Sequence, residues 1–286
     1  LHCFLFTHLV YSHTVIWSIK EEKRMKIDFQ AKKGFICDMD GVLYHGNRIL
    51  PGAAEFVRWL QENNKEYLFL TNNSGMTPKE LQQKLARMGL DVPEEHFYTS
   101  ALATAAFLKA QAPGCSAFVI GEAGLLNALY DAGITMNDVN PDYVVIGEGR
   151  TYSLDTLTRA VNLVLNGAKL IGANSDVSGN IEQGIAPACR ALIAPVEMAT
   201  GKQAYFCGKP NPLMMRTGLR LLGCHSDEAV VVGDRMDTDI IAGMESGIDT
   251  VLVLSGVSDR ETPKTFAYQP TVILNGVGDI PEAARA

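Results

Sequence analysis

The chain has 286 residues, with 25 Lys and Arg against 32 Asp and Glu, so its formal net charge is −7. Apolar residues make up 47% and charged residues 20%, which excludes a disordered chain, a collagen-like rod and a small disulfide scaffold. The length predicts one large domain or two modest ones. No basic run is present, so we expect no nucleic-acid binding, because phosphate backbones require clustered Lys and Arg.

The first 24 residues differ in composition from the rest. They are rich in aromatic residues and His, and they lack the basic start and clean apolar run of a signal peptide. Polar residues interrupt them too often for a membrane span. We therefore expect residues 1–24 to lie outside the fold and the protein to have no membrane attachment. The six cysteines are scattered, which predicts reduced thiols and a cytoplasmic location.

From Lys26 onward, short apolar runs alternate with amphipathic stretches. In the first part of the chain we expect strands at 34–38, 66–71 and 96–100 and helices at 53–63 and 77–89. In the last part we expect strands at 205–207, 229–232, 250–254 and 271–274 and helices at 211–223 and 238–246. Continuous Val, Ile and Leu runs predict a mostly parallel sheet covered on both faces, a Rossmann-like three-layer α/β core.

The middle of the chain carries an alternation of its own. We expect strands at 117–120, 143–146 and 169–173 and helices at 125–132 and 154–166. Pro187 and Pro195 interrupt an otherwise helical stretch, which predicts a kink or break. The pattern favours an α/β domain at 107–203, inserted between core segments at 25–106 and 204–286.

Two strands of the middle segment run into similar turns, Gly121-Glu122 and Gly147-Glu148. These turns resemble nucleotide-binding loops only superficially, because they lack the full G-x-G-x-x-G pattern. We interpret both as ordinary turns of the inserted domain.

Polar residues follow four of the predicted core strands. They are Asp38 and Asp40 after the first, Thr71, Asn72 and Asn73 after the second, Lys209 after 205–207, and Asp234 after 229–232. Ligands bind at the carboxyl ends of parallel strands, so we expect these groups at one edge of one sheet. Carboxylates bind hard cations such as Mg²⁺, and the lysine and hydroxyl bind an anion. The sequence therefore predicts a magnesium and phosphate site.

Four motifs contain these residues, namely DMDGV (38–42), LTNNS (70–74), GKPNP (208–212) and GDRMDTD (233–239). In this order they resemble the haloacid dehalogenase-like (HAD) hydrolase superfamily, and in particular the NagD-type phosphatases, over nearly everything from Met25 onward. In that subfamily a large α/β cap is inserted between the second and third motifs. The resemblance implies Mg²⁺-dependent hydrolysis of small phosphomonoesters, either nucleoside monophosphates or sugar phosphates, and association of copies through the cap.

The resemblance also implies roles for individual residues. Asp38 would be the nucleophile that forms an aspartyl-phosphate, and Asp40 would act first as acid and then as base. Mg²⁺ would be held by Asp38, the backbone carbonyl of Asp40, and Asp234, with Asp239 in support. Thr71 and Lys209 would bind the transferring phosphoryl group, together with backbone N–H groups near Gly41 and Asn72.

Three further residues are candidates for contacts with the rest of the substrate: Asn73, Asp176 and Arg235. The Asn174-Ser175-Asp176 segment could equally be an Asx turn without a ligand. Asp237 is interpreted as a surface acid at a helix start, and His45 as an ordinary loop residue.

Two other functions stay open. A phosphomutase would return the phosphoryl group to substrate rather than to water, and a non-enzymatic sensor would bind a phosphorylated metabolite without cleaving it. Asp40 argues against a dehalogenase, because a halide leaves without a proton. The proton donor also argues against the sensor.

Overall fold

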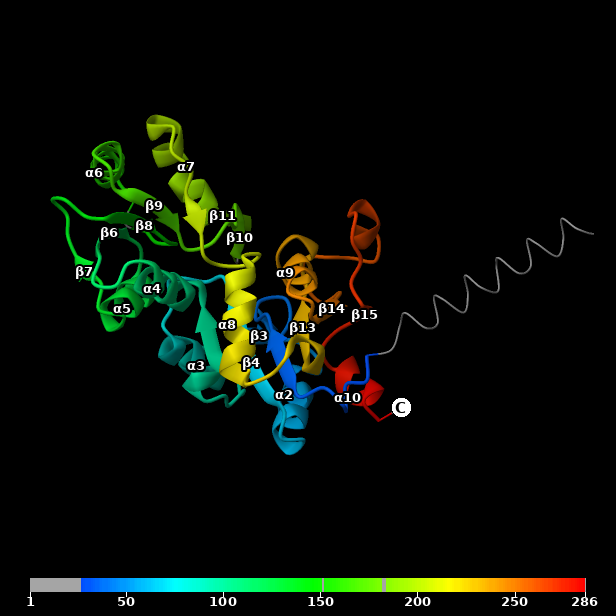
Figure 1. Cartoon of the computed structure of the whole chain (residues 1–286). Helices are drawn as coiled ribbons and strands as arrows, with labels where there is room; N and C mark the ends of the chain where they lie inside the picture. The colour runs from blue at the N-terminus through cyan, green and yellow to red at the C-terminus, as the bar shows by residue number, and fades with distance from the viewer. Residues whose placement is uncertain (1–26, 151, 182–183, 286) are drawn as a thin grey trace, which may run out of the picture.

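The computed structural model describes residues 27–150, 152–181 and 184–285. The expectation for residues 1–24 lies outside this part. Figure 1 shows two neighbouring lobes, one built from both ends of the chain and the other from its middle. Within the described ranges, no helix has the length and apolar character needed to cross a membrane.

The first lobe is built on a six-stranded sheet in which every neighbouring pair is parallel. Its strands, in order across the sheet, are β15 (Val272–Leu274), β14 (Asp249–Val253), β13 (Ala229–Gly233), β1 (Gly34–Cys37), β4 (Glu66–Thr71) and β5 (Phe97–Thr99). The two ends of the chain meet at the centre, where Gly34 is paired with both Ala229 and Glu66. The predicted parallel core is confirmed.

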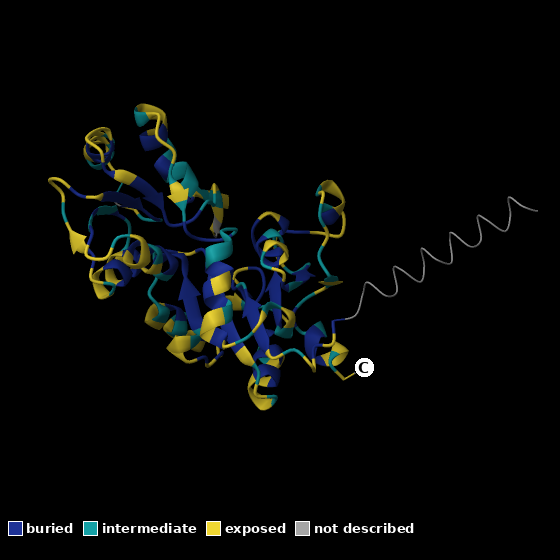
Figure 2. Cartoon of the chain, viewed as in Figure 1, coloured by how far each residue is buried: buried dark blue, intermediate teal, exposed yellow. Residues whose placement is uncertain are grey.

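Side chains of the central strands alternate between two apolar layers, as the pleat of a strand requires. Phe35 and Cys37 join the first layer, and Ile36 joins the second. Helices α2 (Ala53–Glu62), α3 (Pro78–Arg87) and α10 (Asp279–Ala283) cover the first layer, and α4 (Ser100–Gln111), α8 (Pro212–Leu222) and α9 (Ile241–Glu245) cover the second. Figure 2 shows the buried strands between these helices. The predicted three-layer arrangement is present.

The second lobe is built on a five-stranded parallel sheet. Its strands, in order, are β12 (Tyr205–Phe206), β9 (Lys169–Gly172), β8 (Tyr143–Ile146), β6 (Ser116–Ile120) and β7 (Thr135–Met136). Helices α6 (Leu154–Leu165) and α7 (Cys189–Thr200) pack on one face, and α5 (Ala123–Asp131) packs on the other, against α4. A second α/β module in the middle of the chain was expected.

One strand lies in the other sheet from the one predicted. The strand at 205–207 was expected at the catalytic sheet, but Tyr205 and Phe206 are paired with Ile171 and Gly172 of β9. Two residues give a strand too little pattern to identify its neighbour. Lys209 still reaches the catalytic site, because the chain crosses between the sheets directly after β12.

Helix α4 joins the two lobes and was not predicted as a helix. The boundary expected at 107 falls inside it, and its buried residues belong to an apolar cluster that continues into α5 and β8. A helix buried on several sides loses the polar face that makes a helical pattern visible in sequence. The apolar layer between the lobes is therefore continuous.

Several local signals in the sequence form the structures expected of them, and one does not. Thr77 and Glu80 form a capping box at α3, and Asn211 caps α8, which ends at Gly223 in the left-handed conformation. A kink or a break was expected at Pro195, and the break is absent because α7 runs through that residue. Pro187 instead ends β11 (Gly184–Pro187), which forms a hairpin with β10 (Ser178–Ile181). The small hairpin of β2 (Tyr44–His45) and β3 (Arg48–Ile49) was also not expected.

Candidate active site

The site lies at the carboxyl ends of β1, β4 and β13, in the centre of the first sheet. Asp38 follows β1 directly, and its N–H donates to Val232 O at 2.8 Å. The chain then turns at Gly41, whose φ is +78°. A Cβ at Gly41 would lie 2.4 Å from Asp234 Oδ2, so glycine both permits the turn and leaves room for that carboxylate.

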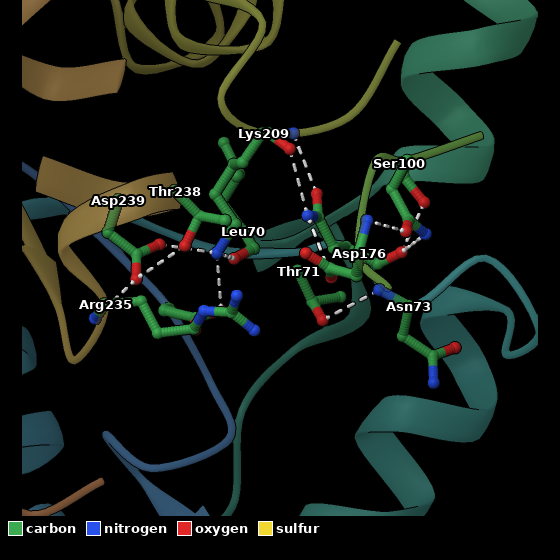
Figure 3. Close-up of polar contacts among 12 residues, drawn as sticks. Leu70, Thr71, Asn73, Ser100, Asp176, Lys209, Arg235, Thr238 and Asp239 are labelled. Carbon is green, nitrogen blue, oxygen red and sulfur yellow. Dashed lines mark hydrogen bonds and ion pairs between the residues drawn. The ribbon is translucent and has the colours of Figure 1, made fainter. Parts of the chain in front are cut away.

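Lys209 is the charged centre of the site. Its side chain is only 3% exposed, and its Nζ lies 2.7 Å from Asp38 Oδ1 and 2.7 Å from Asp239 Oδ1. Nζ also donates to Leu70 O at 3.2 Å. Burial alone would lower the pKa of Lys209, but Asp239 and Asp38 outweigh it and raise the pKa above its usual value. Lys209 is therefore held as a cation against Asp38. Figure 3 draws Lys209 with Asp239 and Arg235 on one side and Thr71 and Asp176 on the other.

Asp234 has an unsatisfied oxygen. Its Oδ2 accepts from Val257 N at 2.7 Å, whereas Oδ1 is buried and has no hydrogen-bond partner among the described residues. Burial, together with the charges of Asp38 and Asp239, raises the pKa of Asp234 to about 8. A bound cation would relieve both the repulsion and the unsatisfied oxygen.

Three carboxylates gather at this point. One oxygen each from Asp38, Asp234 and Asp239 lies within 4.8 Å of the others. An all-oxygen donor set with one unsatisfied buried oxygen fits a hard divalent cation. Both oxygens of Asp239 already have partners, since Oδ1 pairs with Lys209 and Oδ2 accepts from Arg235 N at 3.2 Å. Asp38 and Asp234 would therefore be better placed than Asp239 to hold a cation.

Asp40 stands apart from these carboxylates. Its side chain is 54% exposed and lines the cleft in front of Asp38. Its Oδ1 lies 3.5 Å from Nδ1 of His45, which was interpreted as an ordinary loop residue. The Asp40 carboxyl is therefore accessible to a ligand in the cleft.

The residues after β4 have different roles in the structure. Thr71 lines the cleft, and its Oγ1 accepts from Asn73 N at 3.1 Å. The Oδ1 of Asn73 accepts from Gly75 N and Met76 N, which stabilises the turn. The side chain of Asn72 makes two hydrogen bonds to the backbone of Lys209. Its Oδ1 accepts from Lys209 N at 2.8 Å, and its Nδ2 donates to Lys209 O at 3.1 Å. The Asn72 side chain therefore positions the lysine.

Asp176 faces this site from the second lobe. Its Oδ2 accepts from Asn72 Nδ2 at 3.0 Å, and burial raises its pKa despite the opposing charge of Arg235. The Asx turn weighed as an alternative is present too, because Asp176 N donates to Asn174 Oδ1 at 3.1 Å. Arg235 lines the cleft while it makes a two-point ion pair with Asp237.

A cleft of about 1240 Å³ opens in front of these residues, between the two sheets. The first lobe contributes the catalytic candidates, and the second contributes Glu122, Glu148, Arg150 and Asp176 together with part of the β10–β11 hairpin. The described residues of the lining include no Phe, Tyr or Trp. Both carboxylates and cations are present on the cleft walls.

Sequence reasoning missed a contact between the lobes. Glu148, at the end of β8, accepts from Ser74 N at 2.8 Å and from Asn174 Nδ2 at 2.6 Å. The signals were the Gly-Glu turn itself and the last residue of the LTNNS motif. Neither identifies the other, because the partners lie 74 residues apart.

The comparisons with known proteins cover both halves of the site. A family model described as haloacid dehalogenase-like hydrolase matches residues 35–135, and one described as HAD-hydrolase-like matches residues 206–280. The dihydroxyacetone phosphatase of Corynebacterium glutamicum is 47% identical over 246 residues, which cover 86% of this chain and 90% of that protein.

Two solved structures share the arrangement. NagD of Escherichia coli, a ribonucleotide monophosphatase, is 44% identical over 248 residues, covering 87% of this chain and 98% of that protein. Its structure matches with a TM-score of 0.83 over 87% of this chain and 98% of that one. A 4-nitrophenylphosphatase from Thermotoga maritima matches with a TM-score of 0.86 at 31% identity, over 91% of this chain and 100% of that one.

The four motifs converge on one buried lysine and three carboxylates, and the fold that carries them is shared along most of its length with known phosphatases. The chain therefore belongs to the haloacid dehalogenase-like hydrolases, as a phosphomonoester hydrolase of the NagD type.

Proposed function

We propose that the protein is a Mg²⁺-dependent phosphatase that hydrolyses small phosphomonoesters through an aspartyl-phosphate on Asp38. The observation that carries the proposal is the Lys209 ammonium 2.7 Å from Asp38, beside a buried Asp234 oxygen without a partner among the described residues. The set provides a nucleophile, a fixed cation and an available oxygen ligand in one place. The metal would be held by Asp38, Asp234 and the backbone carbonyl of Asp40.

Electrostatics governs the first step. Phosphate oxygens repel an attacking carboxylate, and bound Mg²⁺ would reduce that repulsion. Lys209 contributes a positive charge that burial and two carboxylates hold in place. Thr71 adds a hydroxyl at the cleft wall. A preorganised charge of this kind stabilises a transition state because it does not have to reorient during the reaction.

The proposed bond changes use the two aspartates in turn. An Asp38 carboxylate oxygen forms a bond to phosphorus, the ester P–O bond breaks, and Asp40 donates a proton to the leaving oxygen. Ionised Asp40 then removes a proton from water, which attacks phosphorus and breaks the bond to Asp38. Inorganic phosphate leaves, and both aspartates return to their starting states. Asp40 suits this role because it is exposed to the cleft rather than paired with Lys209.

Of the two substrate classes expected, the cleft favours sugar phosphates. Stacking on an aromatic side chain is worth about 1–3 kcal/mol per base, and no Phe, Tyr or Trp occurs among the described lining residues. Carboxylates and arginines on the walls instead suit the hydroxyl groups of a small polyol phosphate. The relative named dihydroxyacetone phosphatase supports this class.

Residues 107–203 would act as the cap that selects substrate, since that segment supplies the wall facing the phosphate site. The five cysteines of the described part are free thiols, which supports the proposed cytoplasmic setting.

The test is release of inorganic phosphate from a panel of sugar and nucleoside monophosphates, with Mg²⁺ and with EDTA. We expect metal-dependent release, greatest with short sugar phosphates. A folded protein that binds Mg²⁺ but releases no phosphate would overturn the proposal. Isomerised substrate in that sample would indicate a phosphomutase, and unchanged substrate a sensor.

A further inference from the structure

Two similar turns of the second lobe make different hydrogen bonds. Strands β6 and β8 are neighbours, with Ile120 paired with Ile146, and each is followed by Gly-Glu. Both glutamates line the cleft. The Glu122 carboxylate bonds within its own lobe, accepting from Arg150 N at 2.7 Å. The Glu148 carboxylate instead accepts from Ser74 N of the first lobe at 2.8 Å.

Three hydrogen-bond donors contact the Glu148 carboxylate. Oε2 accepts from both the N–H and the hydroxyl of Ser74, and Oε1 accepts from Asn174 Nδ2 at 2.6 Å. The Ser74 hydroxyl in return accepts from Glu148 N at 2.9 Å. Only a carboxylate satisfies three donors at once, because a carboxamide would turn an NH₂ toward at least one of them.

These contacts continue to the catalytic lysine. Asn174 Nδ2 donates to Asn72 O at 2.6 Å as well as to Glu148. The side chain of Asn72 holds the Lys209 backbone on both sides, and the Lys209 ammonium lies on Asp38. A series of hydrogen bonds and one ion pair, joined through the residues Asn174, Asn72 and Lys209, therefore connects Glu148 to Asp38.

The chain approaches these contacts closely at two glycines. A Cβ at Gly147 would lie 2.7 Å from Ser74 Oγ, and a Cβ at Gly208 would lie 2.6 Å from Asn72 Oδ1. A shift of the Asn72–Ser74 loop would therefore move the lysine as well.

We propose that Glu148 is a positioning residue, which fastens the Asn72–Ser74 loop to the second lobe and thereby keeps Lys209 on Asp38. The proposal rests on the proposed function, since its first readout is the rate of phosphate release. It assigns a catalytic consequence to a cap residue outside the four motifs.

The experiment compares Glu148→Gln with Glu62→Gln, the same substitution at an exposed position of α2 outside the cleft lining, as the control. The measurements are kcat and KM for 4-nitrophenyl phosphate and dihydroxyacetone phosphate, and the dissociation constant of inorganic phosphate with Mg²⁺. We expect Glu148→Gln to lower kcat for both substrates by about 10- to 100-fold, the effect of a small displacement of a catalytic group. Phosphate binding should weaken as well, while Glu62→Gln keeps the wild-type kcat and phosphate affinity.

A stabilising contact alone would lower the melting temperature and leave kcat unchanged below it, which would overturn the proposal. A contact with the substrate's organic group would raise KM for dihydroxyacetone phosphate alone, and that result would overturn the proposal as well. If Glu148→Gln does not fold, Ser74→Ala removes the hydroxyl from the same contact and is expected to lower kcat in its place. If the wild type releases no phosphate, the proposed function fails, and the phosphate titration still decides the role of Glu148.

Discussion

Asn72 holds the backbone of Lys209 from both sides, accepting from its N–H at 2.8 Å and donating to its carbonyl at 3.1 Å. The side chain of Lys209 then reaches Asp38 at 2.7 Å. Lys209 follows a strand of the second sheet, whereas Asn72 follows a strand of the first. These two hydrogen bonds therefore link Lys209 to the first sheet. The residue after Thr71 thus acts on the site through the lysine.

Replacing Asn72 with aspartate tests this relationship. Asn72→Asp keeps an acceptor for Lys209 N but loses both donated bonds, and it sets a second carboxylate beside Asp176. We expect kcat to fall by about 100-fold, as for a catalytic group displaced by about 1 Å. Steady-state kinetics is the measurement, with Asn162→Asp on exposed α6 as the control. An unchanged kcat would show that other contacts place the lysine.

Lys209 itself carries two buried ion pairs, so its loss affects stability and activity together. Lys209→Met leaves Asp38 and Asp239 facing each other without the cation, and breaking a buried pair in this way costs about 3–5 kcal/mol. We expect urea denaturation to show this loss and phosphate release to be abolished. Lys202→Met, at an exposed position, should match the wild type in both. Wild-type stability in Lys209→Met would contradict the charge balance described here.

Asp234 Oδ1, which has no hydrogen-bond partner within the described ranges, predicts opposite effects of metal and chelator. The native pKa of Asp234 is about 8, whereas an unfolded aspartate titrates near 3.9, so between these values the native state binds more protons. The stability of the metal-free protein should therefore fall as the pH rises through this window. A metal at 100 times its dissociation constant adds about 2.7 kcal/mol.

The measurement is the melting temperature of wild type and Asp234→Asn at pH 8, in EDTA and in Mg²⁺. In EDTA the variant should melt at or above the wild type, because the repelling charge is gone. In Mg²⁺ the order should reverse. If Mg²⁺ raises the melting temperature of Asp234→Asn as much as that of the wild type, the metal binds elsewhere.

Much of the fold could be predicted because its signals are local. The Thr77 capping box and the Asn211 and Gly223 ends of α8 depend on residues a few positions apart. The positions of Asp38 and Asp234 followed from the rule that parallel strands present their carboxyl ends at one edge, whereas Lys209 follows a strand of the other sheet. That rule placed the carboxylates correctly.

The rest depended on long-range pairing that no local pattern encodes. The partner of β12 is β9, more than thirty residues earlier, and two residues do not specify it. The same limit hid the bond between Glu148 and Ser74 and the role of Asn72 at Lys209. These contacts join segments that only the packed fold brings together.

Asp40 offers a variant that separates chemistry from folding. Asp40→Asn removes the proton donor but changes a half-exposed side chain, so stability should stay within about 0.5 kcal/mol. General acid–base catalysis contributes about 10²–10⁴-fold, and we expect kcat to fall by that factor while Mg²⁺ and phosphate still bind. Kinetics and phosphate titration check this, with exposed Asp131→Asn as control. Full turnover in Asp40→Asn would assign the proton transfer to another group.

The cleft walls predict a ranking of substrates. Nucleoside monophosphates gain little here, because the described lining offers no Phe, Tyr or Trp for a base to stack on. Short sugar phosphates need no aromatic side chain, and their hydroxyl groups can donate hydrogen bonds to the carboxylates of the cleft walls. We expect kcat/KM for AMP to gain nothing from its base and not to exceed that for dihydroxyacetone phosphate, whereas a base stacked on an aromatic ring would add about 1–3 kcal/mol, a factor of about 5 to 150 in favour of AMP.

Ribose 5-phosphate separates the base from the sugar in this comparison. It shares the phosphorylated ribose of AMP but has no base, so it should be hydrolysed as well as dihydroxyacetone phosphate is. A ranking with AMP first would mean that the base finds its contacts outside the described lining. Equal values for AMP and ribose 5-phosphate would mean that the base stays in solvent and that the cleft selects on the sugar alone.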